Sequence, residues 1–379
     1  MGIGAGDGYA YLDAASSEPL HPAARDVLLA AVDQGYADPR RLHGPGRNAR
    51  LLIDNAREVV AESLAVARDE VVFTSSGTEA VQLGLLGLVR TETAPAVVSA
   101  VEHQAVTDAA GWHGRVVRTV PVDRLGRVDP ETVAEAAATG APEATGVVAV
   151  QHANHEVGTV QPVEQVAERL GGVPLFVDAC ASMGRLPLPD GWSALAGSAH
   201  KWGGPTGVGV LVVRRRAWWA RPYPTDDPVA RTEHGFTDVP GALAAAAALR
   251  AVVAERDEVG RRQRELIDLV RARVAAIPDV DVVGDPDDRL PHLVTFSFLY
   301  VDGEALVTEL DRLGFGLASG SACASDTREP SRVLTAMGAL THGNARLSLT
   351  RDTTRAQVEA LLDALPAVVA RIRAQVGIA

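Results

Sequence analysis

Short apolar runs alternate with helical patterns over the first two thirds of the chain. Each run has the length of a strand, and each intervening stretch has the spacing of a helix. The runs are Val71–Thr74, Ala96–Ser99, Val147–Val150, Leu175–Val177 and Val208–Val213. Such alternation is typical of a mainly parallel sheet with helices on both faces. We therefore predict an α/β fold that binds its ligand at the carboxyl ends of the strands.

The pattern changes after the last of these runs. The Ala-rich segment Gly241–Ala254 continues as a charged helix to about Val274. Beyond it we expect strands at Leu293–Phe298 and Ala345–Leu349, and a final helix from about Thr354. This region predicts a smaller α+β unit.

A chain of 379 residues with 47% hydrophobic content can bury a large core and divide into two domains. We predict a large domain at residues 14–250, and a small domain formed by residues 1–13 and 251–379. No stretch approaches the roughly 18 apolar residues of a membrane span, and the N-terminus lacks the order of a signal peptide. We therefore expect a cytoplasmic protein that contacts no membrane.

The net charge of -12 argues against a general nucleic-acid binder, because phosphate contacts need a basic surface. Cys180 and Cys323 are the only two cysteines, too few for a disulfide framework. A functional cysteine here would act as a thiol. We predict no metal site.

Lys201 is the single lysine among 36 Lys and Arg residues. Arginine can replace lysine in almost any solvated role, but its guanidinium is effectively never deprotonated and cannot attack an aldehyde. An amine that must form an imine has to be lysine. Chance retention and catalysis both explain Lys201 on composition alone.

Three short segments carry residues that suit a pyridoxal-phosphate (PLP) site. Phe73–Glu79 places small hydroxyl residues between a strand and a helix, which suits either a phosphate cradle or an ordinary capped helix start. Leu175–Cys180 delivers Asp178 at a strand end, where it could pair with a protonated pyridine nitrogen or cap a helix. Ser198–Gly209 surrounds Lys201 with glycines that allow close backbone approach.

From Tyr11–Asp13 to the last helix, the sequence resembles the cysteine desulfurases, in the class V aminotransferase branch of the fold-type I PLP enzymes. The most specific stretch is Ala318–Ser325, followed by Glu329–Leu334. It resembles the long cysteine loop of the group I enzymes, which must move between the cofactor and an acceptor protein. A buried structural cysteine would more usually have large apolar neighbours than the small ones around Cys323.

The resemblance implies roles for individual residues. Lys201, Cys323 and His103 would be catalytic, and Arg346 would hold the substrate carboxylate. The residues implied to hold the cofactor are Gly77, Thr78, His155, Asp178, Ser198, His200, Lys201 and Thr237, the last of these reaching across a homodimer.

The sequence also departs from the family pattern. His155 stands where the family has an asparagine that contacts the cofactor ring oxygen, and Ala181 replaces a glutamine that addresses the same oxygen. Ser76 replaces a glycine, and Ala80–Gln82 replaces a Ser-Asn-Asn continuation. We expect His155 to donate the missing hydrogen bond, with a water molecule at the ring oxygen as the alternative.

The resemblance implies a PLP enzyme that converts L-cysteine to alanine and passes the sulfur, as a persulfide on Cys323, to an acceptor protein. The pathway would be iron-sulfur or thiolation chemistry. Two other interpretations stay open, namely a PLP lyase acting on another sulfur or selenium amino acid, and a non-catalytic scaffold that binds sulfur-transfer partners.

Overall fold

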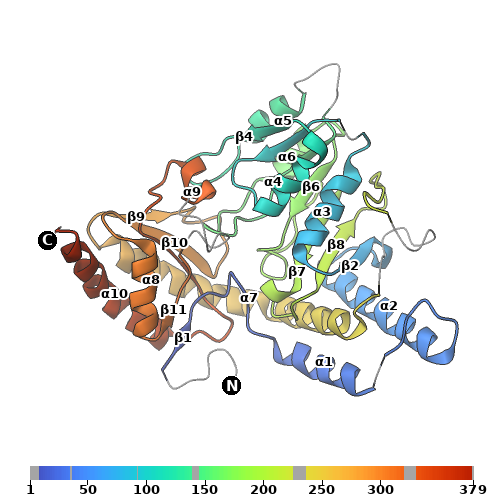
Figure 1. Ribbon diagram of the computed structural model, residues 1–379, viewed down its shortest axis with the longest axis horizontal. Helices are drawn as coiled ribbons and strands as arrows, with labels where there is room; N and C mark the ends of the chain where they lie inside the picture. The colour runs from blue at the N-terminus through green and yellow to red at the C-terminus, as the bar shows by residue number, and fades with distance from the viewer. Residues whose placement is uncertain are drawn as a thin grey trace.

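The computed structural model describes residues 8–34, 36–91, 93–138, 145–224, 236–319 and 330–377. Across these ranges the chain forms a seven-stranded sheet, a three-stranded sheet and a pair of two-residue strands (Figure 1). Within the same ranges, no helix is both long enough and apolar enough to cross a membrane.

The seven-stranded sheet is mainly parallel, because only its strand Gly209–Val213 runs antiparallel to both neighbours. In spatial order the strands are β2 (Val71–Thr74), β8 (Gly209–Val213), β7 (Ala194–Ser198), β6 (Leu175–Asp178), β5 (Val147–Ala149), β3 (Ala96–Ser99) and β4 (Val117–Val120). All five predicted runs lie in this sheet. The pattern of apolar runs did not predict β4, which is only partly buried. It also did not predict β7, whose small residues lack the β-branched character typical of strands.

Helices cover both faces of this sheet. Neighbouring strand residues such as Val97 and Val98 pack into different apolar clusters, because successive side chains point to opposite faces. One face is covered by α1 (Pro22–Gln34), α2 (Gly44–Leu64), α5 (Pro130–Ala138), α6 (Val163–Arg169) and α7 (Val239–Ala275). The other face is covered by α3 (Gly77–Leu88) and α4 (Gln104–Ala110).

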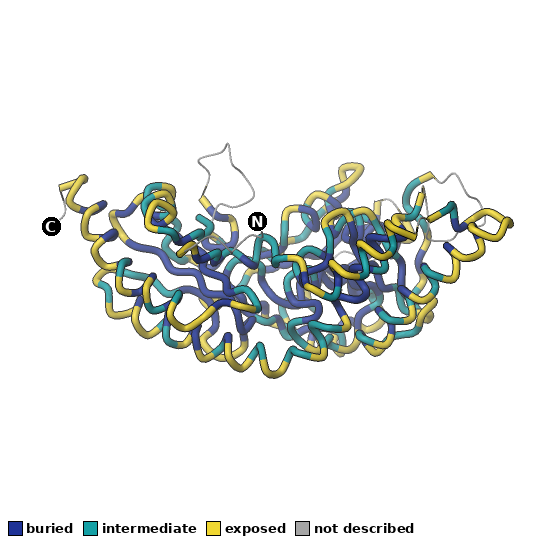
Figure 2. Tube along the Cα trace, turned by 90° about the horizontal axis from the view of Figure 1, so that it is seen from below, coloured by how far each residue is buried: buried dark blue, intermediate teal, exposed yellow. Residues whose placement is uncertain are grey.

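A second apolar core lies around the three-stranded antiparallel sheet, shown in Figure 2 as a separate buried region toward the C-terminus. The elements of this part of the chain are β1 (Ala10–Tyr11), β9 (Val280–Val283), β10 (Leu293–Phe298), α8 (Gly303–Arg312), β11 (Phe315–Gly316), α9 (Arg332–Met337), β12 (Asn344–Ser348) and α10 (Arg355–Gln375). Short 3-10 turns complete the chain at η1 (Arg68–Glu70), η2 (Trp112–Gly114) and η3 (Ala199–Lys201).

The predicted C-terminal elements agree closely with these bounds. The strand Leu293–Phe298 is found as predicted, and the strand predicted at Ala345–Leu349 lies one residue earlier. The final helix follows Thr354, whose side chain caps it by accepting a hydrogen bond from the Gln357 N–H. The domain bounds at residues 13 and 250 stay a prediction.

Candidate active site

The segments that leave β2, β3, β5, β6 and β7 at their carboxyl ends meet around one cavity of about 280 Å³. This volume is just below the roughly 300–1,000 Å³ typical of small-molecule and cofactor pockets. The cavity is lined by Ser16, Gly77, Thr78, Val81, His103, Ala105, Gln151, Ala153, His155, Asp178, Cys180, Ala181, Ser198, His200, Lys201 and Arg346. The fold thus brings most of the predicted site residues together from distant parts of the sequence.

The start of α3 has features both of an ordinary capped helix and of a phosphate cradle. Its N-cap residue Ser76 accepts a hydrogen bond from the Glu79 N–H at 3.1 Å, and the Glu79 carboxylate accepts one from the Ser75 N–H at 2.6 Å. This is ordinary helix capping. Gly77, however, lies so close to the end of β7 that a Cβ atom there would be 2.6 Å from Ser198 Cβ. The helix start can therefore present its backbone N–H groups to an anion in the cavity.

Lys201 enters the cavity from η3, directly after β7. Its Nζ donates hydrogen bonds to the carbonyl oxygens of Ala15 at 2.5 Å and Ser16 at 3.0 Å. Ser198 Oγ and His200 Nδ1 are hydrogen bonded at 3.0 Å. Burial, with a smaller effect of the Lys201 charge, lowers the pKa of His200 to about 4. His200 is therefore neutral at pH 7, so one of its ring nitrogens can accept a hydrogen bond.

Asp178 ends β6 and is 8% exposed. One carboxylate oxygen, Oδ1, accepts a hydrogen bond from the Cys180 N–H at 2.9 Å. Burial and the Asp178 charge raise the pKa of the Cys180 thiol well above its usual range. Cys180 is thus a protonated side chain of the cavity wall, not a reactive thiolate at neutral pH.

Two histidines from different segments meet at the cavity. The His103 and His155 rings are edge to face, with centroids 5.1 Å apart. His155 Nε2 lies 3.6 Å from Glu156 Oε1, and the other Glu156 oxygen accepts a hydrogen bond from Ser331 Oγ at 2.6 Å. Burial, followed by the charges of His103, Arg346 and Lys201, keeps the pKa of His155 well below its usual value. His155 therefore has a single N–H to donate.

Arg346 lies on β12 and reaches the cavity beside the N-terminal segment. Its Nη2 donates to Asp13 Oδ1 at 3.0 Å and to Ser16 Oγ at 2.6 Å, and its Nη1 donates to the His155 carbonyl at 3.0 Å. Its side chain is 5% exposed. The guanidinium is thus held rigidly, with one carboxylate already beside it.

One predicted site residue does not line the cavity, and another lies outside the described residues. Thr237 immediately precedes the N-cap of α7 and is not among the residues that line the cavity. Cys323 and most of its loop lie outside the described residues. The sequence interpretation in turn missed Asp13, Ser16 and Gln151, which have no motif of their own and are identified only by their contacts.

The residues of the cavity fit a PLP group. An amine, a buried carboxylate and a helix start without a side chain at Gly77 are the parts needed for the aldehyde, the pyridine nitrogen and the phosphate. The close approach of Gly77 to Ser198 is the specific feature that a larger residue would destroy. Among the described residues, no cluster of His, Cys, Asp and Glu has the geometry of a metal site.

Comparison with known proteins agrees with this chemistry. The family model described as "Aminotransferase class-V" matches residues 10–361. The chain is 37% identical to an IscS-like cysteine desulfurase of Mycobacterium tuberculosis, over 96% of this chain and 97% of that protein. It is 33% identical to cysteine desulfurase IscS 1 of Archaeoglobus fulgidus, over 96% of this chain and 97% of that protein.

The fold is also similar to solved structures. A NifS-like protein superposes with a TM-score of 0.86 at 26% identity, covering 96% of this chain and all of that one.

Proposed function

The chain belongs to the class-V aminotransferase family and is a PLP-dependent cysteine desulfurase, and we propose that it carries the sulfur of L-cysteine as a persulfide on Cys323 to an acceptor protein. The observation that best supports this proposal is the joint presence of Lys201, Asp178 and Arg346 around one cavity. When bound, PLP supplies an aldehyde for the amine and a ring that accepts electrons.

The residues of the chain have distinct tasks in this proposal. Lys201 Nζ would hold the cofactor through its aldehyde and would serve as the base for the proton on the substrate's α carbon. Asp178 would pair with the ring nitrogen, and His103 would serve as a proton donor or acceptor beside the ring. Arg346 holds the substrate carboxylate, a task suited to its planar fork.

The phosphate ligands come from two strand ends. Gly77 and Thr78 offer backbone N–H groups and a hydroxyl at the start of α3, and Ser198 and His200 face them from the end of β7. We propose that His155 donates a hydrogen bond to the ring oxygen. His155 and Ala181 line this cavity together, which supports that assignment.

The proposed sulfur transfer needs no external oxidant. The carbon-sulfur bond of the substrate breaks and its electron pair stays with carbon, which is protonated to give alanine. The Cys323 sulfur forms a bond to the departing sulfur and becomes a persulfide. An acceptor thiol then takes the outer sulfur and restores Cys323.

We propose that the protein is a homodimer. Exposed apolar side chains are concentrated near α1 and α2, at Leu29, Val32, Leu42 and Leu51. The Tyr36 and Phe236 rings, 54% and 55% exposed, have centroids 6.5 Å apart, so Phe236, the residue before Thr237, lies next to this surface. Exposed apolar patches of this kind mark subunit interfaces. Thr237 would then contribute to the partner's phosphate site, as the family resemblance implies.

We also propose a cytoplasmic role in iron-sulfur or thiolation chemistry, supported by the IscS names of the relatives. The test of the function is to incubate purified, PLP-loaded protein with L-cysteine and to measure alanine and protein-bound persulfide, with and without a reductant. Without the reductant, a single turnover is expected to give equal amounts of alanine and protein-bound persulfide. Sulfide and pyruvate without alanine would instead indicate a lyase.

A further inference from the structure

Arg185 lies directly behind the backbone of Lys201. Its Nη2 donates one hydrogen bond to the Lys201 carbonyl oxygen at 3.0 Å and another to Glu18 Oε2 at 2.8 Å. Both charged side chains are only 9% exposed. A charge-assisted hydrogen bond in such a setting fixes the peptide from which the Lys201 side chain starts. None of the roles proposed above uses this arginine.

Glu18 connects Arg185 to other parts of the fold. Its backbone N–H donates to the His200 carbonyl at 2.9 Å, and its Oε1 accepts a hydrogen bond from the Arg351 N–H at 2.9 Å. Arg351 follows β12, on the C-terminal side of the molecule. Glu18 therefore joins the N-terminal segment to the lysine turn η3 through its backbone, and to the region after β12 through its carboxylate.

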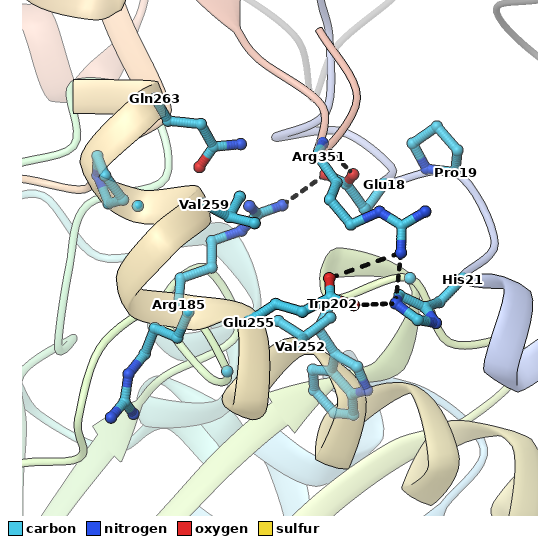
Figure 3. A pocket seen from close by; sticks show the side chains of 15 residues that line it. Glu18, Pro19, His21, Arg185, Trp202, Val252, Glu255, Val259, Gln263 and Arg351 are labelled. Atoms are coloured by element: carbon cyan, nitrogen blue, oxygen red, sulfur yellow. Dashed lines mark hydrogen bonds and ion pairs between the residues drawn. The ribbon is translucent and has the colours of Figure 1, made fainter. Parts of the chain in front are cut away.

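A pocket opens on the far side of this contact, shown in Figure 3. Glu18, Arg185 and Trp202 line it together with residues of α7. The dashed lines of Figure 3 join Arg351 to His21 and Glu255, and Glu255 is 43% exposed. The far end of the network is therefore open to solvent, while the Glu18–Arg185 contact is buried.

The charge of Arg185 also reaches the surroundings of the lysine amine. Arg185 and Lys201 both line a cavity of about 10 Å³, room for about one water molecule, together with His155 and His292. Burial, followed by the charges of Arg185, Arg346 and Lys201, keeps the pKa of His292 well below its usual value. This histidine is therefore neutral, and it does not offset the arginine charge.

Other titratable or charged groups lie around the same contact. Those that share a cavity with the amine are His103, His155, Asp178, Cys180, His200, His292 and Arg346, and those at the far pocket are His21, Glu255, Arg256 and Arg351. Among the contacts of the described residues, Glu18 is the carboxylate that hydrogen bonds the Arg185 guanidinium.

Resting on the proposed function, we propose that Arg185 is a positioning residue that orients Lys201, and that Glu18 sets how much of the arginine's positive charge acts on the lysine nitrogen. A nearby positive charge disfavours protonation of that nitrogen, and a neutralising carboxylate weakens this effect. The pair would thereby adjust the pH at which the cofactor-bound lysine nitrogen loses its proton.

The proposal predicts opposite effects for the two members of the pair. Glu18→Gln leaves the arginine without its counter-charge, so the pKa of the cofactor-bound Lys201 nitrogen should fall by about 0.5–1 pH unit. Arg185→Gln leaves the Glu18 carboxylate without its partner, so the same pKa should rise by a similar amount. In the double variant the two charges are lost together, and the pKa should return to within a few tenths of a unit of the unmodified protein.

The test is a pH titration of the visible absorption of the PLP-loaded full-length variants, with bound cofactor quantified after release by alkali. Arg256→Gln is the matched control, because Arg256 lines the same pocket but forms its ion pair with Asp257, and it should cause no shift. Arg185→Lys should restore part of the positioning. Should Arg185→Gln fail to fold, the Glu18→Gln titration alone decides.

Shifts in the same direction for both single variants, or no shift in either while cofactor remains bound, would overturn the assignment and leave the pair a structural contact. Failure of the unmodified protein to attach PLP through Lys201 would instead overturn the proposed function. The two failures are therefore distinguishable.

Discussion

The rings of His103 and His155 meet edge to face at the candidate active site, with centroids 5.1 Å apart and planes inclined by 70°. His103 is the N-cap of α4, and its Nδ1 accepts a hydrogen bond from the Ala105 N–H at 3.1 Å. The backbone of His155 is held by Arg346. The two rings come from loops after β3 and β5, so the pair exists only because these strands are neighbours.

We expect His155→Ala to weaken PLP retention and to shift the pH dependence of the cofactor absorption. A hydrogen bond to a charged group is typically worth about 1.5–3 kcal/mol, which corresponds to at least a tenfold change in cofactor affinity. Cofactor release on dilution and a spectral pH titration measure both effects. His155→Asn should restore most of the affinity, and unchanged spectra in both variants would leave the ring oxygen to solvent.

Lys201→Ala should lose both the covalent attachment of PLP and alanine formation from L-cysteine. Lys201→Arg keeps the positive charge but cannot form the bond, because a guanidinium is not deprotonated. Absorption spectra after removal of loose PLP, together with alanine assays, test both variants. Alanine release at a rate comparable with that of the unmodified protein would contradict the assignment.

Cys323→Ser should bind PLP and L-cysteine normally but should carry no persulfide. Cys180→Ala is the control, because the half-buried Cys180 lies against Asp178 and the pKa of its thiol is raised. Labelling with radioactive sulfur from L-cysteine, followed by peptide mapping, separates the two cysteines. Label kept in Cys323→Ser and lost in Cys180→Ala would reverse their roles.

Gly77→Ala should reduce PLP affinity by about tenfold or more, because the added Cβ would lie 2.6 Å from Ser198 Cβ and 3.1 Å from Cys180 Sγ. Either β7 or the start of α3 would have to move away from the phosphate. Gly44→Ala, also at a helix start, meets no heavy atom within 4 Å and serves as the matched control. Equal cofactor affinity in the two variants would argue against a phosphate at α3.

The buried Glu102 predicts a specific pH dependence of stability. Burial, opposed by a hydrogen bond from the Gln151 N–H and reinforced by the Asp178 charge, raises the Glu102 pKa from 4.5 to about 8. The unfolded chain therefore loses this proton at lower pH than the native chain. The contribution is complete below about pH 4.5 and is lost as the pH rises toward 8, at no more than about 1.4 kcal/mol per pH unit.

Glu102→Gln should remove this part of the pH dependence. Chemical denaturation of the PLP-free protein between pH 5 and pH 8 measures the free energy of unfolding in both forms. A curve of the same slope for the variant and the unmodified protein would mean that Glu102 titrates normally in the native state.

The local sequence was sufficient to predict several elements. Strands β2, β3 and β10 have the predicted bounds, because each is a short, mostly apolar run with the length of a strand. Strand β7 has no such signature, since its small residues are buried only because β6 and β8 lie on either side. The direction of β8, antiparallel to β7, likewise depends on its neighbour in the sheet.

The residues of the candidate site likewise divide into those that the sequence predicted and those that only the fold identified. Lys201 stands out because it is the single lysine of the chain. An arginine could not form an imine with the cofactor, so this position has to be lysine. Asp178 and Gly77 follow from their places at strand ends.

The sequence by itself thus determined the fold class, the cofactor chemistry and the residues whose side chains have no substitute. Only the tertiary structure decided that Arg346 lies against Asp13, that His103 meets His155, and that Arg185 holds the Lys201 carbonyl. These contacts join residues far apart in the chain and depend on distances and burial. No local pattern contains them, because each partner alone is an ordinary charged or aromatic residue whose role is set by what the fold places beside it.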